Sequence, residues 1–320
     1  MSGRDGIAFV ARRLAVLLVL LVVVSFAVFS LLSIAPGEPV DVLLGTTPRS
    51  AETVQALTQK YHLDKPFLEQ YWIWLRNAVQ LDFGDSIQTQ MPVTDELRQR
   101  LSTSLFLGLY AFAIVMVLGV GLGVIAALRR RTGADRAIVG ASIVALSTPS
   151  FVGGLALIYL FGIVLELFPV YGVGSGFGDE LWHMTLPAVA LALTSTAAVL
   201  KTVRAAIVGV VDQDFMTFAR ARGLSRGRVL VAYGLRNALI PLVTMSGIVL
   251  THLIVGAALV ETTFSLPGLG ELLVTSATQQ DVPMLQAMAV LIAAIVVLVG
   301  LLADLVLVTV DPRIRLGRRA

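Results

Sequence analysis

Long apolar runs, separated by short polar stretches, dominate this chain of 320 residues. Six runs are long enough to cross a bilayer as helices, which takes roughly 20 apolar residues. They are Leu14–Ala35, Ser104–Leu128, Ala141–Phe168, Met184–Val203, Leu239–Val260 and Met284–Val310. The fourth run is the weakest, because Lys201 and Arg204 interrupt its end. The pattern predicts an all-α polytopic membrane protein with six transmembrane helices.

A polar segment, residues 36–103, separates the first two runs. It holds two helical patterns, Ala51–Tyr61 and Pro66–Val79, the second rich in aromatic residues. The segment is too small and too polar to be an independent domain, so we predict an external cap on the membrane part. The predicted organisation is 1–35 as N-terminus and first helix, 36–103 as cap, 104–310 as membrane core with a loop at 210–237, and 311–320 as tail.

The basic residues predict the orientation of the chain in the membrane. With both termini in the cytoplasm, 18 of the 24 Lys and Arg residues lie on the cytoplasmic side, as short cytoplasmic loops require. The other six all lie in residues 36–103, together with nine acidic residues. The first run is longer than a signal-peptide core and no A-x-A site follows it, which favours a retained membrane helix.

Composition narrows the possible chemistry. Hydrophobic residues make up 57% of the chain and charged residues 14%, where soluble domains carry about 25% charged residues. The absence of cysteine excludes disulfides, thiolate metal sites and cysteine nucleophiles. No Gly-Lys-Ser/Thr motif is present, so a P-loop ATP site is excluded as well. We predict no catalytic residue, no cofactor and no metal site in this chain.

The loop at residues 210–237 is patterned as well as basic. Asp214 is a suitable N-cap, and Phe215, Phe218 and Ala219 fall on one face of the helix that would follow. Gly223 is suited to ending that helix in a left-handed turn. A helix with an aromatic face, lying outside the bilayer and flanked by arginines, predicts a docking site for a soluble partner.

Three residues stand out inside the apolar runs. His252 lies in the middle of the fifth run, where it either bonds to a neighbouring helix or serves the transported solute. Asp304 in the sixth run either lines a pathway or pairs with an arginine. Pro149 is interior to the third run and is expected to kink or break its helix. No chain of buried acids of the kind needed for a proton relay is present, which argues against an ion-driven transporter.

Small residues in the second and third runs predict close helix packing. They are Gly119, Gly121, Gly123, Gly153 and Gly154. Glycine in a membrane helix lets a neighbouring backbone approach. Packing is therefore the expected role of all five.

The stretch FARARGLSRGRVLVAYGLRNALIPLVT, residues 218–244, resembles the coupling motif of ABC transporter permeases of the dipeptide/oligopeptide/nickel class. Ala219, Gly223 and Pro241 match the centre and end of that motif. The likeness continues in order along the chain, in ARRLAVLLVLL, APGEPV, HLDKPFLEQYWIWL, LDFGDSIQTQMPV, STPSF, VETTFSLPGLGELL and DPRIRL. Thr217 and Phe218 stand where the broader coupling motif of this family opens with glutamate and alanine. His252 also stands where the family more often has small or apolar residues.

The resemblance implies a type I ABC importer permease fold and a non-catalytic subunit in the bacterial cytoplasmic (inner) membrane. The chain would resemble the first of two homologous permeases in a peptide importer, which share the path and switch by alternating access. Separate cytoplasmic ATPase subunits would bind ATP and Mg²⁺, and an external substrate-binding protein or lipoprotein would deliver cargo. The residues implied in ATPase coupling are Phe215, Phe218, Ala219, Arg220, Arg222, Gly223 and Leu224.

The expected cargo is a di- or oligopeptide. Glu261, Glu271 and Asp281, placed at the outer mouth, would favour a solute with a positive amine, and with His252 and Asp304 they are the substrate-path candidates. The same machine could import a nickel chelate, glutathione or another small solute. From another class, the chain could be a secondary transporter, or a membrane scaffold that recruits a cytoplasmic partner.

Overall fold

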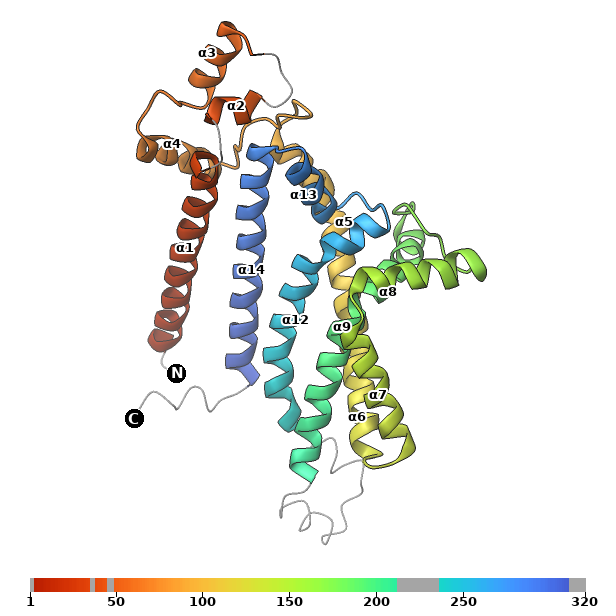
Figure 1. Ribbon diagram of the computed structural model, residues 1–320. Helices are drawn as coiled ribbons and strands as arrows, with labels where there is room; N and C mark the ends of the chain where they lie inside the picture. The colour runs from red at the N-terminus through yellow and green to blue at the C-terminus, as the bar shows by residue number, and fades with distance from the viewer. Residues whose placement is uncertain (1–2, 35–37, 45–48, 212–235, 311–320) are drawn as a thin grey trace. The chain divides into compact units, whose positions relative to one another are not determined.

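The structure is a computed structural model that describes residues 3–34, 38–44, 49–211 and 236–310. Within these ranges the regular structure is entirely helical (Figure 1). The α-helices are α1 (Gly3–Ile34), α2 (Pro39–Leu44), α3 (Ala51–Lys60), α4 (Phe67–Val79), α5 (Val93–Ile114), α6 (Val120–Leu128), α7 (Gly133–Ser147), α8 (Ser150–Leu157), α9 (Phe177–Val211), α12 (Arg236–Thr263), α13 (Leu269–Thr278) and α14 (Val282–Val310). Two π-helical stretches, η1 (Val115–Gly119) and η2 (Ile158–Val164), continue α5 and α8.

Five of the described helical stretches are long and apolar enough to cross a membrane. They are Ala11–Ser30, Val93–Leu128, Phe177–Val210, Ala238–Thr263 and Val282–Thr309. A sixth span results if α7 and the α8–η2 stretch are taken together. These helices confirm the predicted all-α polytopic fold.

The third span, predicted over Ala141–Phe168 with a kink or break at Pro149, is broken at that position, as predicted. The helix begins earlier, at Gly133, ends at Ser147, and restarts at Ser150 in a direction turned by 107°. Pro149 lies in this break with φ −57° and ψ 142°, and Thr148 before it is extended. Proline lacks an N–H and disfavours a helical residue before it, so the helix stops here. An apolar run alone does not reveal such a bend.

The described chain divides into two compact units. We call residues 1–104 with 267–298 the cap unit, and residues 105–266 with 299–320 the core unit. The boundary at residue 104 lies next to the predicted start of the membrane core. The cap unit also takes in the first span and residues 267–298, which the sequence did not associate with it.

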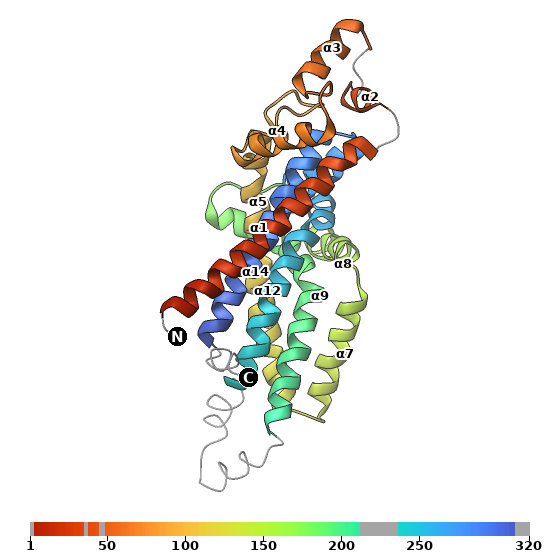
Figure 2. The ribbon, with the colours of Figure 1, turned by 90° about the vertical axis from the view of Figure 1, so that its left-hand side faces the viewer.

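Aromatic side chains join α4 to α1 within the cap unit. Tyr71 lies edge-on to Phe26, with ring centroids 5.1 Å apart, and Phe29 lies 5.5 Å from Trp74. Ser25 and Tyr71 also share a buried hydrogen bond of 2.9 Å. The predicted helices Ala51–Tyr61 and Pro66–Val79 correspond to α3 and α4, each within one residue at either end. Figures 1 and 2 show α4 at the end of α1 in both views.

A second apolar cluster lies elsewhere in the cap unit. It joins the start of α5, α13 and the start of α14. Its buried residues are Val93, Leu97, Leu269, Leu272, Met284, Ala287 and Met288. This cluster connects segments of the cap unit that are more than 150 residues apart in sequence. Residues 267–298 therefore pack against the start of α5.

Helix α9 is the centre of the core unit. It packs against η1, α6, α7, α8 and α12, and it is the most deeply buried of the described spans. Its small side chains, including Ala188, Ala190, Ala192 and Ala197, are almost fully buried. Small residues on one helix let several others approach it closely, so α9 becomes the central helix of the core unit.

Two of the predicted packing glycines make the contact between the second span and α9 possible. A Cβ at Gly119 would lie 2.9 Å from Val199, and one at Gly123 would lie 2.9 Å from the carbonyl oxygen of Leu200. Gly121 points into open space, with no described atom within 4 Å of its Cβ position, so the packing prediction is wrong for this glycine. Positions two residues apart on a helix face different ways, and only one face meets α9.

In the third span, a Cβ at Gly153 would lie 2.6 Å from Leu193, and one at Gly154 would lie 3.0 Å from Phe264. Both glycines are therefore packing positions, as predicted.

Candidate functional site

Helix α12 presents two different faces in the core unit. One face, with Val249, Leu253, Ala257 and Val260, is buried in the core around α9. The opposite face is exposed, and its members follow the helical spacing of three or four residues. They are Thr244, Ile248, His252, Val255 and Leu259. We call these five residues the α12 face.

The α12 face is mostly apolar, yet it carries a histidine. Ile248, Val255 and Leu259 are each more than half exposed. Among the described residues of this chain, none buries these side chains. A polar side chain in a membrane span is costly and functional by default. The structure therefore places His252 where it can serve a path or a subunit contact, and its role in cargo recognition stays a prediction.

The acids predicted at the outer mouth have structural surroundings of their own. Glu261 is fully buried near the end of α12. Glu271 in α13 forms an ion pair with Arg100 of α5 and accepts a hydrogen bond of 2.9 Å from Thr275. Since such pairs hold helices together, neutralising Glu271 would disturb the cap unit as well as any contact with cargo.

Asp281 is the N-terminal anchor of α14. It is 2% exposed, accepts a hydrogen bond of 2.5 Å from the Ser86 hydroxyl, and accepts one of 3.3 Å from the Met284 N–H. A carboxylate at a helix N-terminus satisfies an otherwise unpaired backbone donor and interacts favourably with the helix dipole. Asp281 therefore fixes α14 to the loop around Ser86.

Asp304 lies in the part of α14 that belongs to the core unit, where it is half-buried. Its role in lining a transport path stays a prediction, as do the roles of Glu261, Glu271 and Asp281 in contacting cargo.

An ion pair in the core unit links α7 to α9. The guanidinium of Arg204 donates two hydrogen bonds of 2.8 Å to the two oxygens of Asp135. Asp135 also accepts a bond of 2.9 Å from the Arg131 N–H, and Thr132 caps the same helix end through the Asp135 N–H. Paired hydrogen bonds of this kind fix geometry as well as charge. We call Asp135 and Arg204 the α7–α9 clamp.

Sequence reasoning missed the clamp. Arg204 was used there only as an interruption of the fourth apolar run and as a basic residue that sets the orientation of the chain, and Asp135 was not considered. The signal was present in Thr132-Gly-Ala-Asp135, a Ser/Thr-x-x-Asp/Glu pattern that marks a helix start. This pattern predicts a carboxylate in the first turn of α7, but it does not identify the arginine that pairs with that carboxylate.

The clamp lies close in sequence to the predicted coupling residues. Arg204 stands near the end of α9, which the structure describes to Val211. The coupling residues themselves lie outside the described residues: Phe215, Phe218, Ala219, Arg220, Arg222, Gly223 and Leu224. The description resumes at Arg236 with α12. Helices α9 and α12 are thus the described elements on either side of the predicted coupling segment, residues 212–235.

Comparison with known proteins identifies the class. Among solved structures, the MetNI methionine ABC transporter in inward facing conformations matches with a TM-score of 0.56 at 17% sequence identity, over 67% of this chain and 96% of that chain. At this identity the match shows the fold alone. The spans and this likeness define a polytopic membrane subunit with the type I ABC importer permease fold.

The family follows from two matches that cover most of the chain. Residues 119–316 match the binding-protein-dependent transport system inner membrane component, and residues 6–108 match the N-terminal membrane component of such systems. The chain belongs to this family of inner-membrane components, and it is a multi-pass ABC importer permease. The alternatives of a secondary transporter and of a membrane scaffold are thereby set aside.

Two full-length relatives narrow the family further. The glutathione transport system permease protein GsiC of Escherichia coli (strain K12) is 34% identical over 307 residues, covering 96% of this chain and 98% of the relative. The oligopeptide transport system permease protein AppB of Bacillus subtilis (strain 168) is 36% identical over 313 residues, covering 96% and 99%. Both names confirm the resemblance to permeases of the peptide and oligopeptide class.

Proposed function

We propose that this chain forms half of the membrane path of an ATP-driven importer for short peptides. The observation that carries the proposal is its similarity, over nearly its whole length, to a glutathione permease and an oligopeptide permease. Glutathione is itself a tripeptide, so both relatives' names denote peptide-like solutes. Glutathione is the second candidate cargo, supported by the first of these relatives. Neither of these two names refers to a nickel chelate.

The proposed complex has four kinds of subunit. A second homologous permease completes the path, two cytoplasmic ATPase subunits bind ATP and Mg²⁺, and an external binding protein or lipoprotein delivers cargo. This chain contributes no catalytic group, which agrees with the lack of a P-loop motif in its sequence. The proposal is supported by membership in a family of binding-protein-dependent systems.

The proposed topology places both termini and the loop at residues 210–237 in the cytoplasm, and residues 36–103 outside. The distribution of basic residues supports it, since 18 of the 24 Lys and Arg residues then lie on the cytoplasmic side. ATP binding would draw the ATPase subunits together, and the docked coupling segments would move α9 and α12 between two arrangements. Helices held by packing and by the α7–α9 clamp transmit such a movement better than a free linker would.

We further propose that the α12 face lines the path, that His252 touches cargo, and that Pro149 is a hinge within the third span. The natural chain has no cysteine, so single cysteines can be introduced without removing others. In reconstituted complexes, Val255→Cys is expected to react with a small water-soluble maleimide, at a rate that changes between nucleotide-free and ATP-bound states. Leu253→Cys, on the buried face of the same helix, is the matched control and is expected to stay unreactive.

The labelling result separates a path from a lipid-facing surface. A charged maleimide needs water, and lipid excludes water from the hydrocarbon region of the bilayer. If Val255→Cys is as unreactive as Leu253→Cys in every nucleotide state, the α12 face does not line a path.

A further inference from the structure

The cap unit contains a cavity that no part of the proposed transport mechanism uses. Its volume is about 340 Å³, and α4, the connection between α3 and α4, residues 82–85 and the first turns of α14 line it. Ligand pockets range from about 300 to 1,000 Å³. The cavity is therefore large enough for a small solute and too small for a folded partner.

A buried amide belongs to the wall of this cavity. Gln286 of α14 is 6% exposed and lines the cavity. Its Nε2 has no hydrogen-bond partner among the described residues. Buried polar groups in native proteins are nearly always hydrogen-bonded, and each exception needs an explanation. The missing partner of an N–H donor is an acceptor oxygen, which a bound solute can supply.

The wall of the cavity also contains aromatic rings. Trp74 packs between Phe29 and Phe83, with ring centroids 5.5 and 6.4 Å away, and all three residues line the cavity. Aromatic side chains offer a large apolar surface to a bound molecule. The cavity thus combines an apolar wall with a polar donor, as ligand sites usually do.

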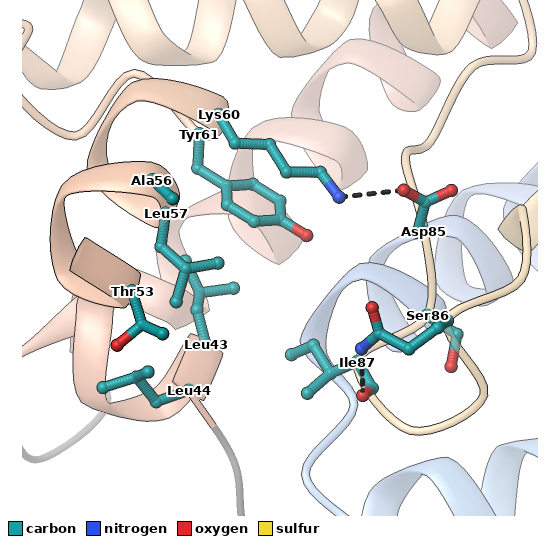
Figure 3. A pocket seen from close by; sticks show the side chains of 11 residues that line it. Leu43, Leu44, Thr53, Ala56, Leu57, Lys60, Tyr61, Asp85, Ser86 and Ile87 are labelled. Atoms are coloured by element: carbon teal, nitrogen blue, oxygen red, sulfur yellow. Dashed lines mark hydrogen bonds and ion pairs between the residues drawn. The ribbon is translucent and has the colours of Figure 1, made fainter. Parts of the chain in front are cut away.

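A charged pair stands at the boundary of the cavity. The Lys60 ammonium donates to Asp85 at 2.8 Å, and the side chains are 47% and 43% exposed (Figure 3). Both residues also line an adjoining cavity of about 230 Å³. The hydrogen bond to Asp85 raises the pKa of Lys60, so the ammonium stays charged at neutral pH. Because both groups remain partly hydrated, each can take a ligand charge without leaving its partner as a buried lone ion.

We propose that this cavity binds a zwitterionic solute with an apolar side group, of the chemistry of an amino acid or a dipeptide. The apolar group packs on the Trp74 wall, and the carboxylate accepts a hydrogen bond from Gln286 and faces Lys60. The ammonium of the ligand faces Asp85. That the ligand is a peptide rests on the proposed function, whereas the site itself does not.

Binding is measured on the purified permease complex in lipid nanodiscs, without ATP and without the binding protein. The probe is the radiolabelled dipeptide Ala-Phe, and its C-terminal amide serves as the analogue that lacks a carboxylate. We expect saturable binding of Ala-Phe and binding at least about tenfold weaker of the amide, since a hydrogen bond to a charged group is lost. Lys60→Gln and Gln286→Leu are each expected to weaken Ala-Phe binding by a similar factor.

The matched control is Lys65→Gln. Lys65 pairs with Glu69 on the surface of the same region and lines neither cavity, so this variant loses the same charge and is expected to bind as the natural chain does. Gln286→Leu removes a donor that has no partner among the described residues, so the ligand-free Tm is expected to hold or rise while the Tm increase caused by a given concentration of Ala-Phe becomes smaller. That second readout distinguishes a lost site from a misfolded one.

Two outcomes overturn the proposal. One is the absence of saturable Ala-Phe binding at millimolar concentration, which would leave a water-filled cavity. The other is equal binding by the natural chain, Lys60→Gln and Gln286→Leu. Neither outcome bears on ATP-driven uptake, because the experiment contains no ATP. Conversely, a complex that binds Ala-Phe here but does not transport it would keep this site and remove the proposed function.

Discussion

Replacing both Phe215 and Phe218 by alanine is expected to lower ATP-driven uptake strongly while the membrane part of the chain stays folded. The two rings fall on one face of the predicted coupling helix, and we propose that they fill a groove on the ATPase. Buried aromatic anchors at protein interfaces contribute about 2 kcal/mol or more each, roughly thirtyfold in affinity. Uptake is therefore expected to fall at least about tenfold.

The measurement is uptake together with the stimulation of ATP hydrolysis by cargo-loaded binding protein. A variant with leucine at both positions keeps an apolar face and is expected to retain part of both activities. Arg220 and Arg222, proposed to pair with an acidic rim, are expected to give smaller losses, since exposed charge pairs contribute little. Normal uptake and normal stimulation by the double alanine variant would show that the rings do not dock the ATPase.

Breaking the α7–α9 clamp is expected to lower both the Tm of the complex and the rate of uptake. Asp135→Asn removes the charge, and Arg204→Gln leaves Asp135 without its bidentate partner. The Asp135 side chain is only 6% exposed, and a carboxylate left there without its partner is destabilising. Because α9 leads to the coupling segment, its loosened end is also expected to transmit less of the ATPase movement.

Two further variants make the clamp experiment specific. Arg204→Lys keeps the charge but loses the planar pair of donors, so its Tm is expected between those of the natural chain and Arg204→Gln. Arg136→Gln removes an exposed charge next to Asp135 and is expected to change neither quantity. If Asp135→Asn keeps the natural Tm and uptake rate, the clamp neither stabilises the core unit nor carries movement.

The sequence predicted those parts of the fold that depend on local pattern. Apolar runs located the membrane helices, and the patterns at Ala51–Tyr61 and Pro66–Val79 located α3 and α4 within one residue. Pro149 predicted a break because the missing N–H acts on its own helix. The direction of the 107° bend depends on what α8 packs against, which in the core unit is α9 together with α12. No local pattern contains that information.

The partners of polar groups were the part that sequence could not supply. Asp281 was predicted at the outer mouth, but its hydrogen bond from Ser86, which lies 195 positions away in sequence, could not be predicted. Gly121 was grouped with Gly123, although only Gly123 meets α9. The cavity around Gln286 is built from segments of the cap unit that are far apart in the chain. Each of these outcomes is decided by tertiary packing.

The central claim, a permease for peptides in an ATP-driven importer, is tested most directly by uptake into proteoliposomes. The vesicles contain this chain with its neighbouring permease, ATPase and binding protein. Labelled di- to pentapeptides, glutathione and nickel are compared in one preparation, with and without ATP. The account predicts that a peptide accumulates only with ATP and only when Phe215 and Phe218 are intact. Accumulation of nickel alone, or no ATP-dependent uptake of any of the three by well-folded complexes, would contradict it.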